Sequence, residues 1–301
     1  MVAFFGLTVG GLIWGDLAPQ FLKSDKVENH LSAAALGFAA TTVISLLAYP
    51  ALPPVFSLTV KGLLSLVSIL GVVSVPFIFS GVAVCLALTK FPRQVSQLYA
   101  ADLVGAAAGC MLVIYTLRFI DAPTAVVYSG AVAGFGALLF VLGDRTSWLC
   151  RRSLWFTCTI ALLGTANLIL ASRHRSVLEP AWMGGTNAMR PIYERWNSFS
   201  RVAVQGDPEA FYKPFGWGLS SAYRGQAMVR QLSVRIDSGA QTVMTHYDGD
   251  LQKLNYLQYD ITNFAHYFRP DSRVLVIGAR RKGRSLRPRV RAEVGDCCRN
   301  E

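Results

Sequence analysis

Hydrophobic and polar positions divide the chain into two parts. Up to about residue 172 the apolar residues come in long runs with few charges, and after it polar and aromatic residues dominate. A helix of about 20 apolar residues crosses the roughly 30 Å hydrocarbon core of a bilayer. The pattern therefore predicts a multi-pass helical membrane protein with spans at 2–19, 31–49, 58–89, 98–117, 124–142 and 154–171.

The apolar run at 58–89 is too long for one ordinary crossing, because as a single helix it would measure about 48 Å. Pro76 is its only break. We expect two short spans hinged at Val75–Phe77, which gives seven spans, or six if Pro76 only kinks a tilted helix. With seven spans, the loops hold five basic residues on the tail side and six on the other. The positive-inside rule then predicts no orientation.

Small residues four positions apart let two helix backbones approach closely. The first span carries Gly6/Gly10 and Gly11/Gly15, and later spans carry Gly105/Gly109 and Gly130/Gly134. We expect these faces to pack against neighbouring helices of the same chain. The same faces would allow a homodimer within the lipid bilayer.

Asp102 is the one acidic residue near the interior of a predicted span. A carboxylate within a membrane is costly, which makes it a functional candidate such as a proton or cation site. The alternative places Asp102 in the first helical turn at the interface. There the helix dipole and the nearby Lys90 or Arg93 would favour it.

After residue 172 the period of the pattern changes to that of short strands. Alternating positions predict a strand at the end of the segment 193–204 and further strands at 232–237 and 241–244. Apolar residues at helical spacing predict a helix over 251–268. The apolar run 274–277, closed by Gly278, is typical of the first strand of a nucleotide-binding fold. We therefore divide the chain into a membrane domain (1–172), a small β/α soluble region (173–279) and a basic tail (280–301).

Composition changes this picture little. The net charge is +11, and residues 280–301 contribute eight basic and three acidic side chains, a net of +5. This basic tail has no interleaved aromatic residues, so we expect no nucleic-acid partner. The six cysteines show no paired or metal-ligand spacing, which predicts neither a disulfide framework nor a metal site.

The order of these elements resembles the spermidine/spermine synthase (aminopropyltransferase) family, and in particular its membrane-fused members. Asp237-Ser238-Gly239-Ala240-Gln241 matches the Asp-x-x-x-Gln element of that family, and Asp248-Gly249-Asp250 follows near its acidic position. The segments 76–81 and 98–106 are similar to the membrane motifs of those members, and 273–278 resembles the strand that enters their Gly-rich loop.

This resemblance implies that a small β domain leads into a Rossmann-like, methyltransferase-type domain. It implies that Gln241 and Gly278 contact decarboxylated S-adenosylmethionine or a related nucleoside in intact relatives. It also implies that Asp237, Asp248 and Asp250 face a cationic polyamine. For the three acids and Gln241 a turn or capping role is the alternative. The family setting further suggests a bacterial inner membrane with the soluble region in the cytoplasm.

The sequence departs from the family where the chemistry would lie. It has no GxGGG-type loop, no acid ending a second strand and no later catalytic Asp. We therefore expect no cofactor and no catalysis in this chain. With permissible codons chosen for residues 283–300, a reading frame shifted by one nucleotide encodes DVLSALVFGQKSVTAVEM, which continues the family pattern. We therefore interpret the residues from about Arg280 as out of frame. The alternatives are a transport or scaffold protein that works through its helical bundle, and a degraded gene copy without function.

Overall fold

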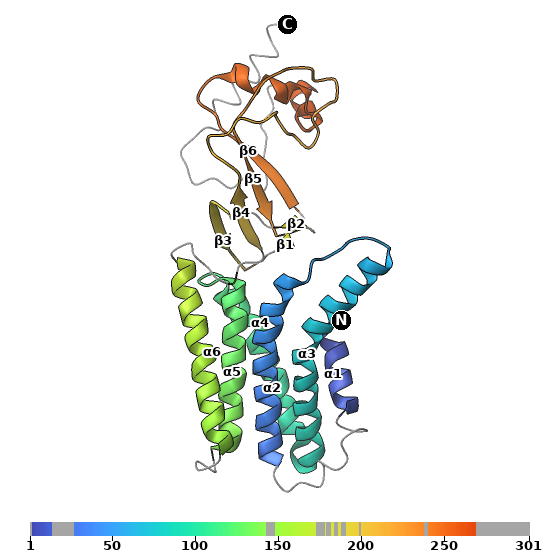
Figure 1. Ribbon diagram of the computed structural model, residues 1–301, viewed down its shortest axis with the longest axis vertical. Helices are drawn as coiled ribbons and strands as arrows, with labels where there is room; N and C mark the ends of the chain where they lie inside the picture. The colour runs from blue at the N-terminus through green and yellow to red at the C-terminus, as the bar shows by residue number, and fades with distance from the viewer. Residues whose placement is uncertain are drawn as a thin grey trace. The chain divides into compact units, whose positions relative to one another are not determined.

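The computed structural model describes residues 2–13, 27–142, 148–172, 178, 182–183, 186–187, 191–198, 200–237 and 240–268. They form two compact units, one mainly helical and one mainly β (Figure 1). The helical unit contains α1 (Val2–Leu12), α2 (Val27–Ala48), α3 (Val60–Lys90), α4 (Val95–Thr116), α5 (Ala122–Val141) and α6 (Trp148–Ser172).

The predicted membrane region is confirmed in its main features. The helices α2 to α6 are five elements long and apolar enough to cross a membrane. Helix α1 has 11 described residues, which gives it a length of only about 16 Å. The rest of the predicted first span lies outside the described residues, so whether α1 belongs to a further span stays a prediction.

The predicted division of 58–89 into two spans is wrong, because α3 is one helix of 31 residues with Pro76 inside it. Proline has no N–H, so the carbonyl of Val72, four residues earlier, loses its helical partner. The hydroxyl of Ser45 in α2 donates to this carbonyl oxygen at 2.7 Å. Neighbouring helices commonly satisfy backbone groups that proline frees in this way. The helix therefore continues through Pro76.

The close packing predicted for two of the glycine pairs is confirmed. A Cβ added at Gly6 would lie 2.7 Å from the backbone oxygen of Ser74 in α3, and one added at Gly10 would meet the backbone of Ile78. In α5, a Cβ at Gly130 would lie 3.3 Å from the oxygen of Ala39 in α2, and one at Gly134 would lie 2.6 Å from Thr157 Oγ1 in α6. Only glycine allows these approaches without a shift.

The core of the helical unit is built from small residues and internal polar pairs. Ala39, Val127, Ala131 and Ile160 form a buried cluster between α2, α5 and α6. Near it, the buried Asn167 of α6 donates to Thr124 Oγ1 of α5 at 2.8 Å. The buried Ser32 and Ser153 hydroxyls lie 3.4 Å apart and link α2 to α6. Hydrogen bonds of this kind help to hold membrane helices together.

The β unit contains a four-stranded sheet in the order β3 (Tyr193–Trp196), β4 (Arg201–Gln205), β5 (Gln231–Ile236) and β6 (Ala240–Thr245). A separate pair joins β1 (Trp182–Met183) to β2 (Thr186–Asn187). The antiparallel register places Val204 opposite Val234 and Arg235 opposite Gln241. The three predicted strands are confirmed, and β3 is an addition.

The predicted helix over 251–268 is wrong as a single element. The structure has 3-10 segments at η5 (Leu251–Tyr259) and η6 (Ile261–Asn263), and only then the short helix α7 (Phe264–Phe268). The break falls at Asp260, whose backbone is extended and pairs with Leu219 in an isolated bridge. Its carboxylate accepts the Thr262 N–H at 2.9 Å and so starts a new turn. The predicted strand 274–277 and the Rossmann-like domain lie outside the described residues.

The Ser45–Val72 hydrogen bond generates a double-mutant prediction. We expect Ser45→Ala to lower the free energy of unfolding in detergent by about 1 kcal/mol, because it leaves the Val72 carbonyl without a donor. In a Pro76→Ala background, residue 76 regains its N–H and the same Ser45 change should cost markedly less. Ser129→Ala, which removes a hydroxyl bonded within its own helix to Val126, is the matched control. Equal costs of Ser45→Ala in both backgrounds would contradict this account of Pro76.

Candidate functional site

The residues that the sequence singles out lie at the two ends of the hairpin formed by β5 and β6. Asp237 and Gln241 flank the turn between the strands, and Asp248 and Asp250 follow the far end of β6. The extended strand β6 separates Gln241 from Thr245 by about 13 Å. Gln241 and the two later acids therefore lie at opposite ends of this strand.

Asp237 fastens the end of β5 to β4. Its Oδ1 accepts the Arg201 N–H at 2.8 Å, and its own N–H donates to the Arg201 carbonyl at 2.9 Å. Its φ of 53° lies in the left-handed region, which Asp tolerates better than most residues. These contacts are those of a capping residue, and its implied role toward a polyamine stays a prediction.

Gln241 lies in β6 opposite Arg235. Its backbone oxygen accepts the Trp217 indole N–H at 2.5 Å. Trp217 is 67% exposed and stacks edge-on with Phe215, with ring centroids 5.8 Å apart. An exposed aromatic surface thus lies beside the residue that the family resemblance connects with the nucleoside donor.

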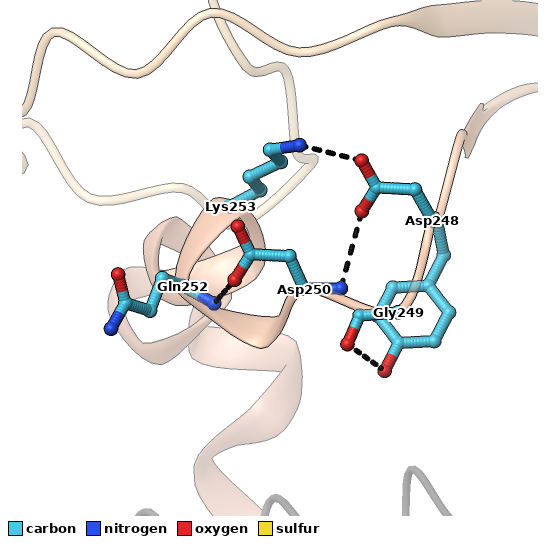
Figure 2. A network of polar contacts seen from close by, with 6 residues as sticks. Asp248, Gly249, Asp250, Gln252 and Lys253 are labelled. Carbon is cyan, nitrogen blue, oxygen red and sulfur yellow. Dashed lines mark hydrogen bonds and ion pairs between the residues drawn. The ribbon is translucent and has the colours of Figure 1, made fainter.

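The second group is an acidic turn, defined here as residues 248–253 (Figure 2). Asp248 Oδ2 pairs with Lys253 Nζ at 2.5 Å, and Asp248 Oδ1 accepts the Asp250 N–H at 3.2 Å. Asp250 in turn caps η5 by accepting the Gln252 N–H at 3.0 Å. Gly249 between the two acids has a φ of 104°, a backbone conformation that residues other than glycine rarely adopt.

The ion pair of the acidic turn is open to solvent. The hydrogen bond from Lys253 lowers the pKa of Asp248 below its ordinary value, and the backbone N–H of Asp250 adds to this effect. In the same way Asp248 raises the pKa of Lys253, and the charge of Asp250 contributes in the same direction. Two carboxylates thus act on one primary ammonium group at the protein surface.

A buried hydrogen-bond network holds η5, and with it the acidic turn, against the sheet. Gln231 at the start of β5 pairs with the backbone of Phe215, accepting its N–H at 2.9 Å and donating to its oxygen at 3.2 Å. The Gln231 amide also donates to the hydroxyl of Tyr256 in η5 at 3.2 Å, and that hydroxyl lies 2.9 Å from Thr245 Oγ1. Tyr256 is 1% exposed, so this anchor is shielded from water.

Two of the sequence-predicted candidates lie elsewhere. Gly278 falls outside the described residues. Asp102 is exposed on α4, a helix in which no residue is buried. Nothing lies within 4 Å of a Cβ added at Gly105 or Gly109, so the packing predicted for this pair is not formed within the described part of the helical unit.

Sequence reasoning missed Lys253 and Trp217. Lys253 lies five residues after Asp248, a spacing that brings the two together only because Gly249 turns the chain back. Trp217 belongs to an irregular segment between β4 and β5, where no periodic pattern identifies a partner. The Gly216-Trp217-Gly218 sequence was the available signal, since paired glycines often accompany close backbone approach.

Among the residues that the structure describes, no group of three or more His, Cys, Asp or Glu side chains has the arrangement of a metal site. Searches against protein-family models, curated proteins and solved structures found no match to this chain.

The pairing within the acidic turn generates a titration prediction. A carboxyl whose pKa is lowered in the folded state stabilises the fold above its unfolded pKa, and this contribution is lost as the pH falls through the folded pKa. Lys253→Met removes the hydrogen-bond donor that lowers the pKa of Asp248, so this pKa should rise. Carboxyl-carbon NMR during an acid titration measures it. Lys213→Met, which removes an exposed charge that does not contribute to the lowered pKa of Asp248, is the control. An unchanged Asp248 titration in Lys253→Met would contradict the assigned cause.

Proposed function

We propose that this chain is a membrane-anchored relative of the aminopropyltransferases whose acidic turn recognises a cationic polyamine. The observation that carries the proposal is the ion pair between Asp248 and a primary ammonium group, with the Asp250 carboxylate two residues away in the same turn. In the structure that group belongs to Lys253. Polyamines present the same group at the ends of flexible alkyl chains.

Lys253 stands in for the terminal ammonium of a ligand. Its Nζ lies 2.5 Å from Asp248 Oδ2, and its side chain is 57% exposed. An exposed ion pair of this kind contributes little to stability, so an external amine displaces it at small cost. A polyamine carries several ammonium groups, and the second carboxylate, Asp250, offers a site for the next one.

The acidic turn is also organised without any ligand. Gly249 provides the sharp change of direction, the Asp250 cap fixes η5, and the Tyr256 network anchors that segment to the sheet. A preorganised site loses less conformational entropy on binding than a flexible one. The family resemblance supports the choice of polyamine over other cations.

We expect recognition without group transfer. The sequence has no GxGGG-type loop and no later catalytic Asp, and it is interpreted as out of frame from about Arg280. Decarboxylated S-adenosylmethionine is accordingly proposed as a ligand of intact relatives only. Aminopropyl transfer by the purified full chain would overturn this part of the proposal.

The acidic turn generates the binding prediction. Spermidine should bind the full chain in detergent, with affinity that falls as salt rises, because the contacts are between exposed charges. Asp248→Asn and Asp250→Asn should each weaken binding by about three- to fivefold, which corresponds to roughly 1 kcal/mol. Lys253→Met should strengthen binding, because it removes the internal competitor. Titration calorimetry measures the spermidine affinity of the unchanged chain and of the three variants.

The control for this experiment is Asp207→Asn. Asp207 is likewise an exposed acid that accepts a backbone N–H two residues later, from Glu209 at 2.9 Å. This control should leave spermidine affinity unchanged. If Lys253→Met weakens binding, or if Asp207→Asn weakens it as much as Asp248→Asn does, the acidic turn is not the binding site.

A second candidate function, a scaffold or transport role of the bundle, is supported by the open surface of α4. Asp102, Gly105, Ala106 and Gly109 lie three, four and seven positions apart, so they share one face of the helix. All four are exposed, and Asp102 is a costly group to leave against lipid. A homodimer through this face would cover the carboxylate and use the unfilled space at both glycines.

Cysteine cross-linking in membranes tests this second candidate. In a full chain whose native cysteines are replaced by serine, Ala106→Cys should form a disulfide-linked dimer under mild oxidation. Val104→Cys, on the opposite side of α4 and 68% exposed, is the control and should not. Adding Gly105→Leu should abolish the cross-link at residue 106. Equal cross-linking at 104 and 106 would argue against a specific α4 interface.

A further inference from the structure

The continuity of α3 changes which loops share a side of the membrane. With α3 as one crossing, α2 to α6 alternate in direction, and each connection between them is assigned to one end of the bundle (Figure 1). The first end, called here the basic end, is where α3 ends and α6 begins. The second, called the exit end, is where α3 begins and α6 ends.

The basic residues are distributed unequally between these two ends. The basic end, counted from the sequence through the connections and first helical turns, holds seven: Lys23, Lys26, Lys90, Arg93, Arg145, Arg151 and Arg152. The exit end holds four: Lys61, Arg118, Arg173 and Arg175. Arg190, 18 residues beyond Ser172, would raise the second count to five. The balance found for seven spans disappears because every base before Pro76 changes sides relative to those after it: Lys23 and Lys26 join Lys90 and Arg93, and Lys61 leaves them.

The start of α6 shows why the basic end suits one leaflet in particular. Its first turns carry Arg151 and Arg152 and no acidic residue, although the positive end of a helix dipole disfavours basic groups. The guanidinium of Arg152 lies 3.7 Å from the ring centroid of the exposed Trp148. Tryptophan and arginine at a helix end are typical of the headgroup region. Anionic headgroups there would compensate the unfavourable charge.

We propose that the basic end faces the cytoplasmic leaflet and that the chain therefore leaves α6 on the extracytoplasmic side. Anionic lipids give the cytoplasmic leaflet a negative surface potential, which stabilises lysine and arginine near it by about 1 kcal/mol each. A surplus of three basic residues in short connections is the pattern that the positive-inside rule describes. This orientation reverses the expectation of a cytoplasmic soluble region.

This inference is independent of the proposed amine recognition. Spermidine binding by the purified chain does not depend on which side of a membrane the β unit occupies. The orientation determines instead which pool of amines the acidic turn meets, namely the one outside the cytoplasm. A failed orientation test leaves the binding result intact, and a failed binding test leaves the orientation intact.

Cysteine accessibility in intact bacterial cells tests the orientation. Single cysteines are placed in the cysteine-free full chain at Ser57 between α2 and α3, at Lys213 in the β unit and at Gln94 at the basic end, all exposed positions. A membrane-impermeant maleimide should label Ser57→Cys and Lys213→Cys in intact cells. It should label Gln94→Cys only after permeabilisation. Labelling of Gln94→Cys alone in intact cells would overturn the proposal.

Charge variants test whether the basic residues set this orientation. Replacing Arg93, Arg151 and Arg152 by glutamine makes the two ends equal at four bases each. This variant should give mixed orientation, so that both Lys213→Cys and Gln94→Cys become partly labelled in intact cells. The control, Lys61→Gln with Arg118→Gln, enlarges the original surplus and should leave the pattern unchanged. Unchanged labelling in the triple variant would refute the assigned cause.

Discussion

The requirement that every backbone polar group within a bilayer finds a partner determines much of this molecule. At Pro76 the helical ladder of α3 lacks one donor, and the Ser45 hydroxyl supplies it to the Val72 carbonyl. One side chain on α2 thus satisfies the backbone group that Pro76 frees within the continuous helix α3. The continuity of α3 then fixes the alternation of the later helices, and through it the distribution of basic residues between the two ends.

Close backbone contact is the second means by which the helical unit is held together. Gly6, Gly10, Gly130 and Gly134 each lie against a neighbouring helix, where van der Waals contact replaces the hydrophobic effect that operates in water. Helix α4 has the same glycine spacing without such a neighbour among the described residues. The same sequence signal therefore corresponds to formed packing in two helices and to an open face in a third, a difference that depends on three-dimensional context.

The limits of the sequence reasoning follow the range of the interactions involved. Long apolar runs and alternating strands depend on local periodicity, so α2, α4, α5, α6 and the strands β4 to β6 were predictable. The continuity of α3 depends on Ser45, 27 residues before Val72, and the break at Asp260 depends on its pairing with Leu219. The carboxylates of the acidic turn were predicted as candidates, whereas Lys253 depends on the conformation of Gly249.

The separation of Gln241 from the acidic turn has a consequence for function. The contacts of Asp248 and Asp250 are made within residues 248–253, and that turn is anchored by Tyr256 to Gln231 and Thr245. The proposed recognition of an ammonium group therefore rests on residues of the described β unit. Gln241, by contrast, lies in the β5–β6 ladder and contacts Trp217 through its backbone, and the role proposed for it needs a bound nucleoside. The proposed amine recognition is thus separable from donor binding, and each can be tested by itself.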